Sequence, residues 1–229
     1  MQSISLIIPI FNEEKNIEIL FKEIKNCQAF TKISKVIFVD DSSSDKSIQI
    51  LEYLKDKENK ITLLKNDKNL GQSYCIHSAV KFTNDQLIIT MDGDCQNDPK
   101  DIIKLIDLYL KNYDVKLVSG IRVNRKDSLS KIFASKIANY IRRVILNDNC
   151  IDTGCSLKIF DKSVFLSLPY FDGMHRFLPA LFNIYEKKVI FVPVNHRFRK
   201  YGKSKYGNFR RLIKGIKDLI KVKNIMKNK

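Results

Sequence analysis

The sequence is poor in residues that build sulfur- or imidazole-based sites. It contains five cysteines, none in a CxxC pair, and three histidines, and no zinc-ligand spacing is present. An odd number of unpatterned cysteines argues against a disulfide framework and favours a reducing, cytoplasmic setting. No apolar run approaches the roughly 20 residues needed to cross a bilayer, and the first residues lead directly into an apolar strand. We therefore expect neither a signal peptide nor a membrane span.

Two common nucleotide-binding signatures are also missing. No GxGxxG follows the first apolar strand, and no Walker A pattern occurs. The dinucleotide fingerprint and the P-loop are therefore excluded. The chain otherwise has the composition of an ordinary globular protein, with 44% hydrophobic and 29% charged residues. Its 229 residues are enough for one sizeable core.

Acidic residues are scarce at one end of the chain. The net charge is +16 overall, yet residues 195–229 hold thirteen Lys or Arg and a single acid, Asp218. The preceding part of the chain is close to balanced. Such asymmetry indicates an anionic partner at the C-terminal end, which could be phosphate groups, a membrane surface or nucleic acid.

Segments with strand and helix spacing alternate through the first half of the chain. We expect strands over residues 5–9, 36–39, 61–64 and 86–91, and helices over residues 16–27, 44–55 and 72–82. This alternation predicts an α/β fold with a mostly parallel sheet flanked by helices. The second half is less regular, with strands expected over residues 115–120, 156–160 and 189–194, and helices over residues 128–146, 177–185 and 206–226.

Polar loops follow the expected strands. They cover residues 11–13, 40–43, 69–72 and 92–94. Because the carboxyl ends of parallel strands share one edge of a sheet, and ligands bind at that edge, we expect these four loops to converge on one site.

The most informative of these loops holds two carboxylates one residue apart, Asp92 and Asp94, directly after an apolar strand. Neighbouring carboxylates repel each other and resist burial. A hard divalent cation resolves the conflict, because Mg²⁺ and Mn²⁺ take carboxylate oxygens together with substrate phosphates. Asp-Gly-Asp is also ordinary turn chemistry, so the metal interpretation depends on the other loops.

Four segments in order have a recognisable pattern. They read Ser-Leu-Ile-Ile-Pro-Ile-Phe-Asn-Glu-Glu at 5–14, Val-Asp-Asp-Ser-Ser-Ser-Asp at 39–45, Asn-Leu-Gly-Gln at 69–72 and Met-Asp-Gly-Asp-Cys-Gln-Asn-Asp-Pro at 91–99. This set resembles the family 2 glycosyltransferases, which have a Rossmann-like GT-A fold. Later segments resemble the polyprenyl-phosphate members, which include dolichol-phosphate mannose synthase and undecaprenyl-phosphate glycosyltransferases; they cover residues 120–127, 152–156, 174–177 and 199–205.

The resemblance implies roles for individual residues. The nucleotide-sugar pocket would be lined by Pro9, Phe11, Glu13, Asp41, Gly71 and Asp92. A divalent metal, Mg²⁺ or Mn²⁺, would be held by Asp92, Asp94 and Gln96. Catalytic roles would fall to Asp94, Asp152, Arg122 and Arg176, and binding of the acceptor phosphate to Arg122, Arg125, Arg199, Ser204 and Lys205. Arginine suits this task because its planar fork pairs bidentately with phosphate oxygens. Asp152 could instead make a simple Asx-turn.

The same resemblance implies a reaction and its partners. A UDP- or GDP-linked sugar would be transferred, with inversion at the anomeric carbon, to a polyprenyl phosphate. Residues 1–205 would form the GT-A domain and residues 206–229 a basic amphipathic C-terminal helix. With an apolar stripe flanked by lysines, that helix is expected to lie on an anionic membrane surface. The enzyme would then act at the inner face of the cytoplasmic membrane, with a membrane-protein partner as a further expectation.

Two alternatives stay open at this level. The same donor chemistry could serve a saccharide or soluble acceptor in cell-envelope polysaccharide synthesis, which would need a carboxylate base such as Asp152. A non-catalytic module that binds nucleic acid or membrane would also explain the charge. Against nucleic acid, stacking aromatics are not interleaved with the basic residues and no helix-turn-helix, RRM or KH pattern is present.

Overall fold

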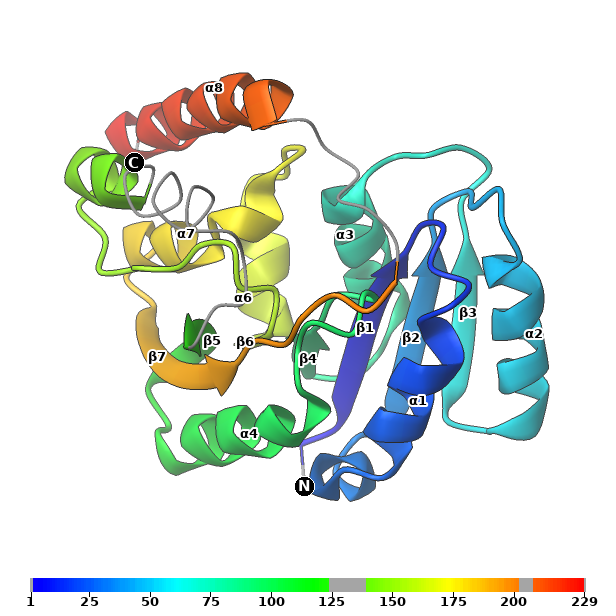
Figure 1. The fold of residues 1–229 in the computed structure, drawn as a ribbon. Coiled ribbons are helices and arrows are strands. Elements are labelled where there is room, and N and C mark those ends of the chain that lie inside the picture. The colour runs from blue at the N-terminus through cyan, green and yellow to red at the C-terminus, as the bar shows by residue number, and fades with distance from the viewer. Residues whose placement is uncertain (1, 124–138, 202–207, 229) are drawn as a thin grey trace.

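Apolar strands form a central sheet that is buried on both faces (Figure 1). The computed structural model describes residues 2–123, 139–201 and 208–228. The strands are β1 (Ile4–Ile10), β2 (Lys35–Asp40), β3 (Ile61–Lys65), β4 (Leu87–Thr90), β5 (Val115–Val123), β6 (Lys158–Asp161) and β7 (Lys188–Asn195). The helices are α1 (Ile17–Lys25), α2 (Ser47–Lys57), α3 (Gln72–Phe82), α4 (Ile102–Lys111), α6 (Lys162–Ser167), α7 (Leu178–Ile184) and α8 (Asn208–Lys227).

The sheet has the strand order β3-β2-β1-β4-β6-β5-β7. β1 pairs in parallel with β2 and β4, and β2 with β3. β6 runs antiparallel to both of its neighbours, β4 and β5, while β5 and β7 are parallel to each other. The carboxyl ends of all strands except β6 therefore meet at one edge of the sheet, and β6 begins at that edge.

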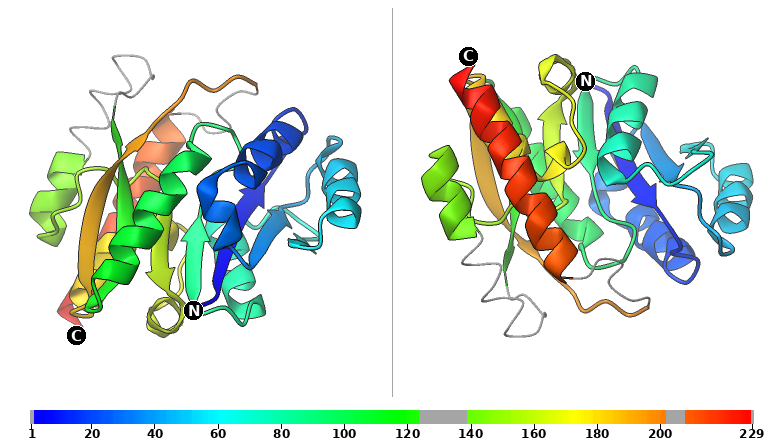
Figure 2. Two further views of the ribbon diagram at one scale, coloured as in Figure 1. Left: turned by 90° about the horizontal axis from the view of Figure 1, so that it is seen from below. Right: turned by 90° about the horizontal axis from the view of Figure 1, so that it is seen from above.

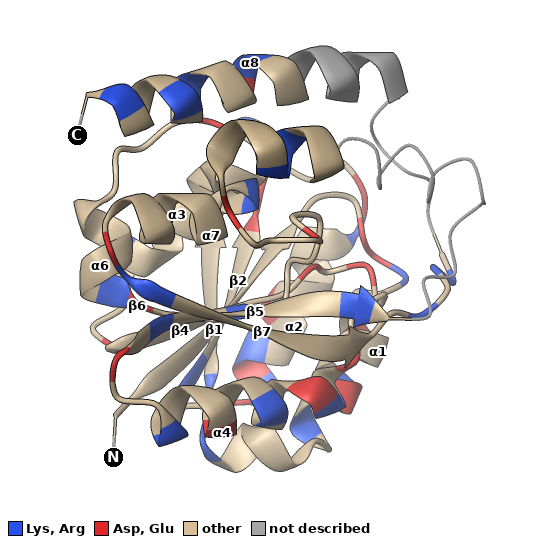
Figure 3. Cartoon of the chain, turned by 90° about the vertical axis from the view of Figure 1, so that its left-hand side faces the viewer, with Lys and Arg blue, Asp and Glu red and all other residues tan. Residues whose placement is uncertain are grey.

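Side chains alternate between the two faces, as the period of a strand requires. Leu6 and Ile8 of β1 pack in the core that includes α1 and α4, whereas Ile7 packs in the core that includes α3, α6 and α7. Figure 3 shows these two helical layers on opposite sides of the sheet, with α8 outside the second layer. The fold class expected from the sequence, a mostly parallel sheet flanked by helices, is confirmed.

Helix α8 lies on the outside of the molecule, as the view from above in Figure 2 shows. Its side chains are described from residue 215 onward. Asp218 and Val222 are buried, whereas Ile216 and Ile220 are 50% and 55% exposed. The expected apolar stripe is therefore divided between a face that packs on the protein and a face in solvent. No helix in the described ranges is long and apolar enough to cross a membrane.

Two helices were not expected from the sequence. α4 follows a short 3-10 turn at Pro99–Asp101, where the Asp98 side chain accepts a hydrogen bond from the N–H of Lys100. Its apolar residues recur at helical spacing and are buried against the sheet, so the signal was present. α6 has only six residues, which is too short for periodicity to reveal. Of the helix expected over residues 128–146, residues 139–146 are described and are helical.

Candidate active site

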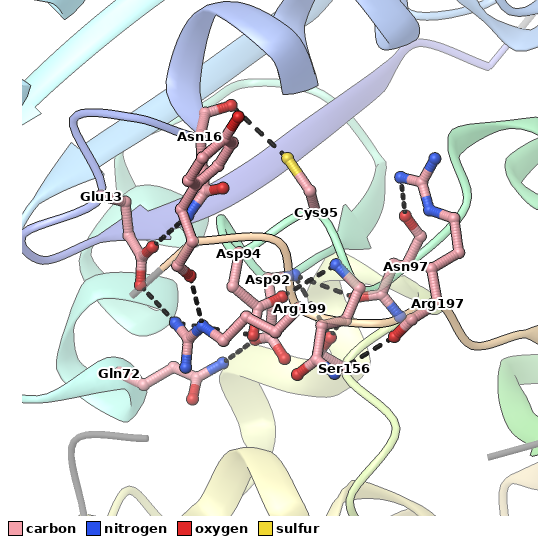
Figure 4. A network of polar contacts seen from close by, with 12 residues as sticks. Glu13, Asn16, Gln72, Asp92, Asp94, Cys95, Asn97, Ser156, Arg197 and Arg199 are labelled. Carbon is pink, nitrogen blue, oxygen red and sulfur yellow. Dashed lines mark hydrogen bonds and ion pairs between the residues drawn. The ribbon is translucent and has the colours of Figure 1, made fainter. Parts of the chain in front are cut away.

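The polar loops converge where β1, β2 and β4 end, as the sequence predicted. Figure 4 shows residues from separate segments of the chain in one network of polar contacts. Its central members are Asp92 and Asp94, which follow β4. The loop before β6 and the segment after β7 reach the same place, because β6 begins and β7 ends at this edge.

Asp92 is held by contacts from three directions. Its Oδ1 accepts a hydrogen bond from Nε2 of Gln72, the first residue of α3, at 2.8 Å. Its backbone N–H faces Oδ1 of Asn97 at 3.3 Å and Oγ of Ser156 at 3.2 Å, and these two side chains bond to each other at 2.8 Å. The carboxylate is thus fixed in place by its neighbours.

The side chain of Asp94 is largely buried, at 15% exposed. Burial raises the pKa of its carboxyl to about 6, and the nearby charges of Asp92 and Glu13 act in the same direction. A hydrogen bond from the N–H of Gln96 and the charge of Arg199 oppose this rise. The site therefore disfavours an isolated negative charge on Asp94 and favours the arrival of a cation.

The residues at this edge fit a hard divalent cation. Asp92 and Asp94 supply carboxylate oxygens from adjacent positions, as the sequence predicted, and Mg²⁺ sites commonly use one or two carboxylates plus substrate phosphates. Among the described residues, no group of three or more His, Cys, Asp or Glu side chains is arranged to hold a metal. Two carboxylates supply part of the coordination of such a cation, and the phosphates of a substrate would supply further oxygens. The role of Gln96 stays a prediction; its Nε2 donates to the carbonyl of Arg197 at 3.2 Å.

The segment 195–201 crosses the acidic loop and is anchored to it. Gln96 accepts a backbone hydrogen bond from the N–H of Arg197 at 2.9 Å. The Arg197 guanidinium bonds to Glu23 and to the carbonyl of Asn97, each at 2.7 Å. Two residues on, Nη2 of Arg199 lies 2.7 Å from Oε1 of Glu13. We call residues 195–201 the strap.

The loops after β1 and β2 interlock beside this network. The N–H of Asn12 bonds to Oγ of Ser43 at 2.9 Å, and Oδ1 of Asn12 accepts from the N–H of Ser44 at 2.7 Å. Asn12 and Ser42 have φ of 52° and 63°, in the left-handed region that non-glycine residues rarely adopt. Such conformations persist only where their surroundings enforce them, as at binding sites. Pro9 and Phe11, predicted to line a nucleotide pocket, lie at this end of β1.

The paired acids at the end of β2 have different surroundings. Asp41 accepts hydrogen bonds from Nδ2 of Asn66 and from the N–H groups of Leu70 and Gly71 at 2.8–2.9 Å, so it organises the loop before α3. Gly71 has φ of 86°, a conformation that glycine adopts freely. Asp40 is equally buried, at 4% exposed, and its Oδ1 has no hydrogen-bond partner among the described residues. The sequence pointed to Asp41 for base recognition and gave no role to Asp40.

Arg122 and Asp152 were predicted separately and lie against each other. Nε and Nη2 of Arg122 donate to the two oxygens of Asp152 at 2.8 Å each. Burial alone would lower the pKa of the Arg122 guanidinium, but the hydrogen bonds and charge of Asp152 outweigh it and raise that pKa. Arg122 therefore stays charged at any pH at which the protein is folded.

Arg176 lies on the short turn before α7, and its Nη2 donates to Oδ2 of Asp218 in α8 at 2.6 Å. Asp218 is 3% exposed and approaches Gly173 so closely that a side chain there would not fit. The pair fastens α8 to the body of the protein. The catalytic role expected for Arg176 stays a prediction.

Several expected residues lie outside the described part of the chain, namely Arg125, Ser204 and Lys205. Others became visible only in three dimensions. Gln72 supports Asp92, Asn97 and Ser156 support the acidic loop, and Asp40 provides an unsatisfied carboxylate oxygen. Gln72 sits inside a segment already singled out, Asn-Leu-Gly-Gln, so its position at a strand end was a usable signal.

Known proteins resemble this chain in sequence. Residues 5–168 match the family Glycosyl transferase family 2. The undecaprenyl-phosphate 4-deoxy-4-formamido-L-arabinose transferase of Pectobacterium carotovorum is 32% identical over 222 residues, a match that covers 96% of this chain and 67% of that protein. The protein of the same name from Photorhabdus laumondii is 35% identical with the same coverage.

Solved structures resemble it in fold. Glucosyl-3-phosphoglycerate synthase from Mycobacterium tuberculosis, crystallised with Mn²⁺, UDP and glucosyl-3-phosphoglycerate, superposes with a TM-score of 0.71 at 14% identity, covering 96% of this chain and 78% of that one. The same enzyme with Mg²⁺ and UDP gives a TM-score of 0.70 at 16% identity, covering 95% of this chain and 79% of that one. At these identities the likeness concerns the fold alone.

Proposed function

The chain belongs to glycosyl transferase family 2 and is a glycosyltransferase, and from this premise we propose that it transfers a sugar from a nucleotide-diphosphate donor to undecaprenyl phosphate. Relatives at 32% and 35% identity bear the name of undecaprenyl-phosphate sugar transferases. The main structural support is the pair Asp92 and Asp94 at the end of β4, where burial and mutual repulsion favour a cation. Family membership sets aside the non-catalytic nucleic-acid alternative.

The donor would bind across the loops that follow β1, β2 and β4. Asp40 is the buried carboxylate with an oxygen left to accept an N–H from the base, because Asp41 already binds the loop before α3. Gly71 allows close backbone approach to the nucleotide.

Charge on the leaving group determines what the site must provide. A divalent cation held by Asp92 and Asp94, with the donor diphosphate completing its coordination, would neutralise the charge that develops on the departing nucleotide. Structural neighbours crystallised with Mn²⁺ or Mg²⁺ and UDP support this proposal. Arg199, on the strap beside Asp94, would add a fixed positive charge in a partly buried site.

The acceptor would need little activation. A lipid phosphate is already ionised at neutral pH, so no strong general base is required. Asp152 is suited to a positioning role, since its oxygens accept hydrogen bonds from Arg122 and from the N–H of Gly154. The permanently charged Arg122 would then be held in one orientation, ready to pair with a phosphate.

The membrane is proposed as the place of action. The exposed Ile216 and Ile220 of α8 alternate with exposed Lys217, Lys221 and Lys223. Apolar side chains among lysines are typical of a helix that lies in the interface of an anionic bilayer. Such placement at the inner face of the cytoplasmic membrane would bring the strap and the acidic loop close to a lipid-borne acceptor.

A donor panel tests the proposal. UDP- and GDP-linked sugars are offered with and without undecaprenyl phosphate, and nucleotide release and lipid product are measured. We expect one donor to be consumed only when the lipid is present. Excess EDTA and the Asp94→Ala variant, checked for folding by circular dichroism, should both abolish turnover. Nucleotide release that requires a saccharide and not the lipid would favour the alternative acceptor, and turnover that persists in EDTA would reject the metal.

A further inference from the structure

Arg199 lies beside the carboxylate of Asp94, which a donor-bound cation would also need. Its Nη2 lies 2.7 Å from Oε1 of Glu13 and 3.8 Å from Oδ2 of Asp94. The guanidinium is therefore shared unequally, with a direct hydrogen bond to Glu13 and a looser ion pair to Asp94. Figure 4 shows the three side chains pointing toward one another from the loops after β1 and β4 and from the strap.

Glu13 is a fixed point in this arrangement. Its second oxygen, Oε2, accepts a hydrogen bond from Nδ2 of Asn16 at 2.6 Å, and Asn16 is 1% exposed. The backbone N–H of Glu13 bonds to Oγ of Ser47 at 2.9 Å. Since Glu13 is held by the N-cap residue of α1 and by the first residue of α2, Arg199 can release Asp94 and stay bound to Glu13.

The charges involved are poorly screened. The side chains of Glu13, Asp94 and Arg199 are 8%, 15% and 21% exposed. At such burial, charges about 4 Å apart interact more strongly than they would in bulk water. A guanidinium and a divalent cation at one carboxylate would repel each other, so occupation of Asp94 by one weakens binding of the other.

The strap keeps Arg199 within reach of the site. Its backbone is fastened at Arg197, whose N–H and carbonyl both bond to Gln96. Along the strap, Arg197 and Arg199 face the protein, while Phe198 is 65% exposed and Lys200 is also exposed. The tether therefore limits Arg199 to short movements between nearby anions.

We propose, resting on the function proposed above, that Arg199 is an internal competitor of the metal at Asp94 which the donor diphosphate converts into a partner. Metal alone must displace Arg199 from Asp94 without offering it another anion. Metal that arrives with a nucleoside diphosphate brings phosphate oxygens, and Arg199 can pair with them while staying on Glu13. Cation and nucleotide consequently bind synergistically, and Glu13 is the residue that positions Arg199 for both states.

Mn²⁺ binding to the full chain, measured by electron paramagnetic resonance of the free ion, tests this directly. We expect Arg199→Gln to bind Mn²⁺ alone about tenfold more tightly than the unmodified protein, within the usual range of coupling between two sites. In the same variant, added UDP or GDP should improve Mn²⁺ binding far less than it does in the unmodified protein. Lys200→Gln, which removes a neighbouring exposed charge from the strap, should leave both affinities unchanged.

The outcomes separate the inference from the function on which it rests. Arg199→Lys retains the charge and should still compete with Mn²⁺. Equal affinity of Arg199→Gln and the unmodified protein for Mn²⁺ alone, with binding lost in Asp94→Ala, would overturn the competitor and leave the proposed function intact. Equal gains in Mn²⁺ affinity in Arg199→Gln and Lys200→Gln would also overturn the proposed competition, because they would indicate a general effect of charge. Failure of every protein to bind Mn²⁺, even with UDP or GDP, would reject the metal-dependent function as well.

Discussion

Arg122 and Asp152 are each other's partner: Nε and Nη2 of the guanidinium bond to the two carboxylate oxygens at 2.8 Å, across thirty positions of sequence. The backbone N–H groups of Arg122 and Gly154 donate to the same carboxylate. These bonds engage both oxygens of the carboxylate, and the two from the guanidinium side chain are charge-assisted. The geometry favours Asp152 as the residue that orients Arg122.

Removing one member of this pair should lower the free energy of unfolding more than removing both. With side chains 15% and 7% exposed, Asp152→Ala would leave a buried guanidinium without its counter-charge, and we expect a loss of about 3 kcal/mol in the free energy of unfolding. The double variant Arg122→Met with Asp152→Leu should recover part of this lost stability. Urea unfolding measures the stability of both variants. A double variant no more stable than Asp152→Ala would mean that the pair is not a unit.

The pH dependence of activity in an Asp152→Asn variant distinguishes a positioning role from base catalysis. Asp152→Asn retains the shape of the side chain and should lower kcat by misplacing Arg122, without changing the shape of the pH profile. A general base would instead show itself as an acidic limb that disappears in the variant. Steady-state rates between pH 5 and 9 make the comparison.

Asp40 and Asp41 should respond oppositely to loss of charge. Asp41→Asn should lower the melting temperature, because Asp41 accepts the N–H groups of Leu70 and Gly71 and an amide cannot replace both oxygens. Asp40→Asn should leave the melting temperature unchanged or raise it, since Oδ1 of Asp40 is buried without a partner among the described residues. Calorimetry of nucleotide binding should show the larger loss for Asp40→Asn. The reverse pattern would assign recognition of the nucleotide base to Asp41.

The buried Asp94 should make stability fall as pH rises. Its pKa of about 6 in the folded protein lies above the ordinary 3.8, so the unfolded chain releases this proton more easily. The resulting cost develops between about pH 4 and pH 6 and persists above that range. In EDTA at pH 8, Asp94→Asn should therefore be more stable by about 3 kcal/mol, with no difference near pH 4.

The exposed Asp107 of α4, 48% accessible, provides a matched control for this measurement. Asp107→Asn should change stability little at either pH, because its charge is already solvated. Below pH 6 the proton on Asp94 should also compete with the metal, so Mn²⁺ affinity should fall about tenfold per pH unit there. Affinity independent of pH between 4 and 6 would contradict the raised pKa.

The exposed face of α8 should govern membrane attachment. Replacing Ile216 and Ile220 by Ser leaves the buried Asp218 and Val222 in place, so the helix should stay packed. We expect flotation with anionic phosphatidylglycerol vesicles to fall several-fold while donor binding is retained. Tyr113→Ser, which removes a 95% exposed aromatic before β5, should have no effect. Equal loss of vesicle and donor binding would indicate damage to the fold.

The sequence was sufficient to predict a mostly parallel sheet and the edge of it at which the polar loops meet. The carboxyl ends of parallel strands lie at one edge of a sheet, so the sequence alone places residues 11–13, 40–43 and 92–94 together. Helix α4 could also have been predicted, because its apolar period and the Asp98-Pro99 before it are visible in the sequence. Boundaries shifted by a few residues, as at β6, where the chain enters the sheet two residues later than expected.

Pairings between distant side chains were beyond reach. Nothing local to Arg176 indicates Asp218, and nothing local to Arg122 indicates Asp152, because each pairing depends on how two separate segments are brought together by the sheet. The left-handed backbone at Asn12 and Ser42 was equally hidden, since neither residue is glycine. Such features arise from tertiary contacts that override local preference.

The reversed direction of β6 has a consequence for altering the enzyme. Because β6 enters the sheet at the rim where its neighbours leave it, the stretch between β5 and β6 both departs from and returns to that rim as one excursion. The segment can therefore be exchanged for that of a relative by joining the chains at two strand ends, without cutting through the loops after β1, β2 and β4. Chimeras built at these junctions would change this segment while leaving the loops after β1, β2 and β4 as they are.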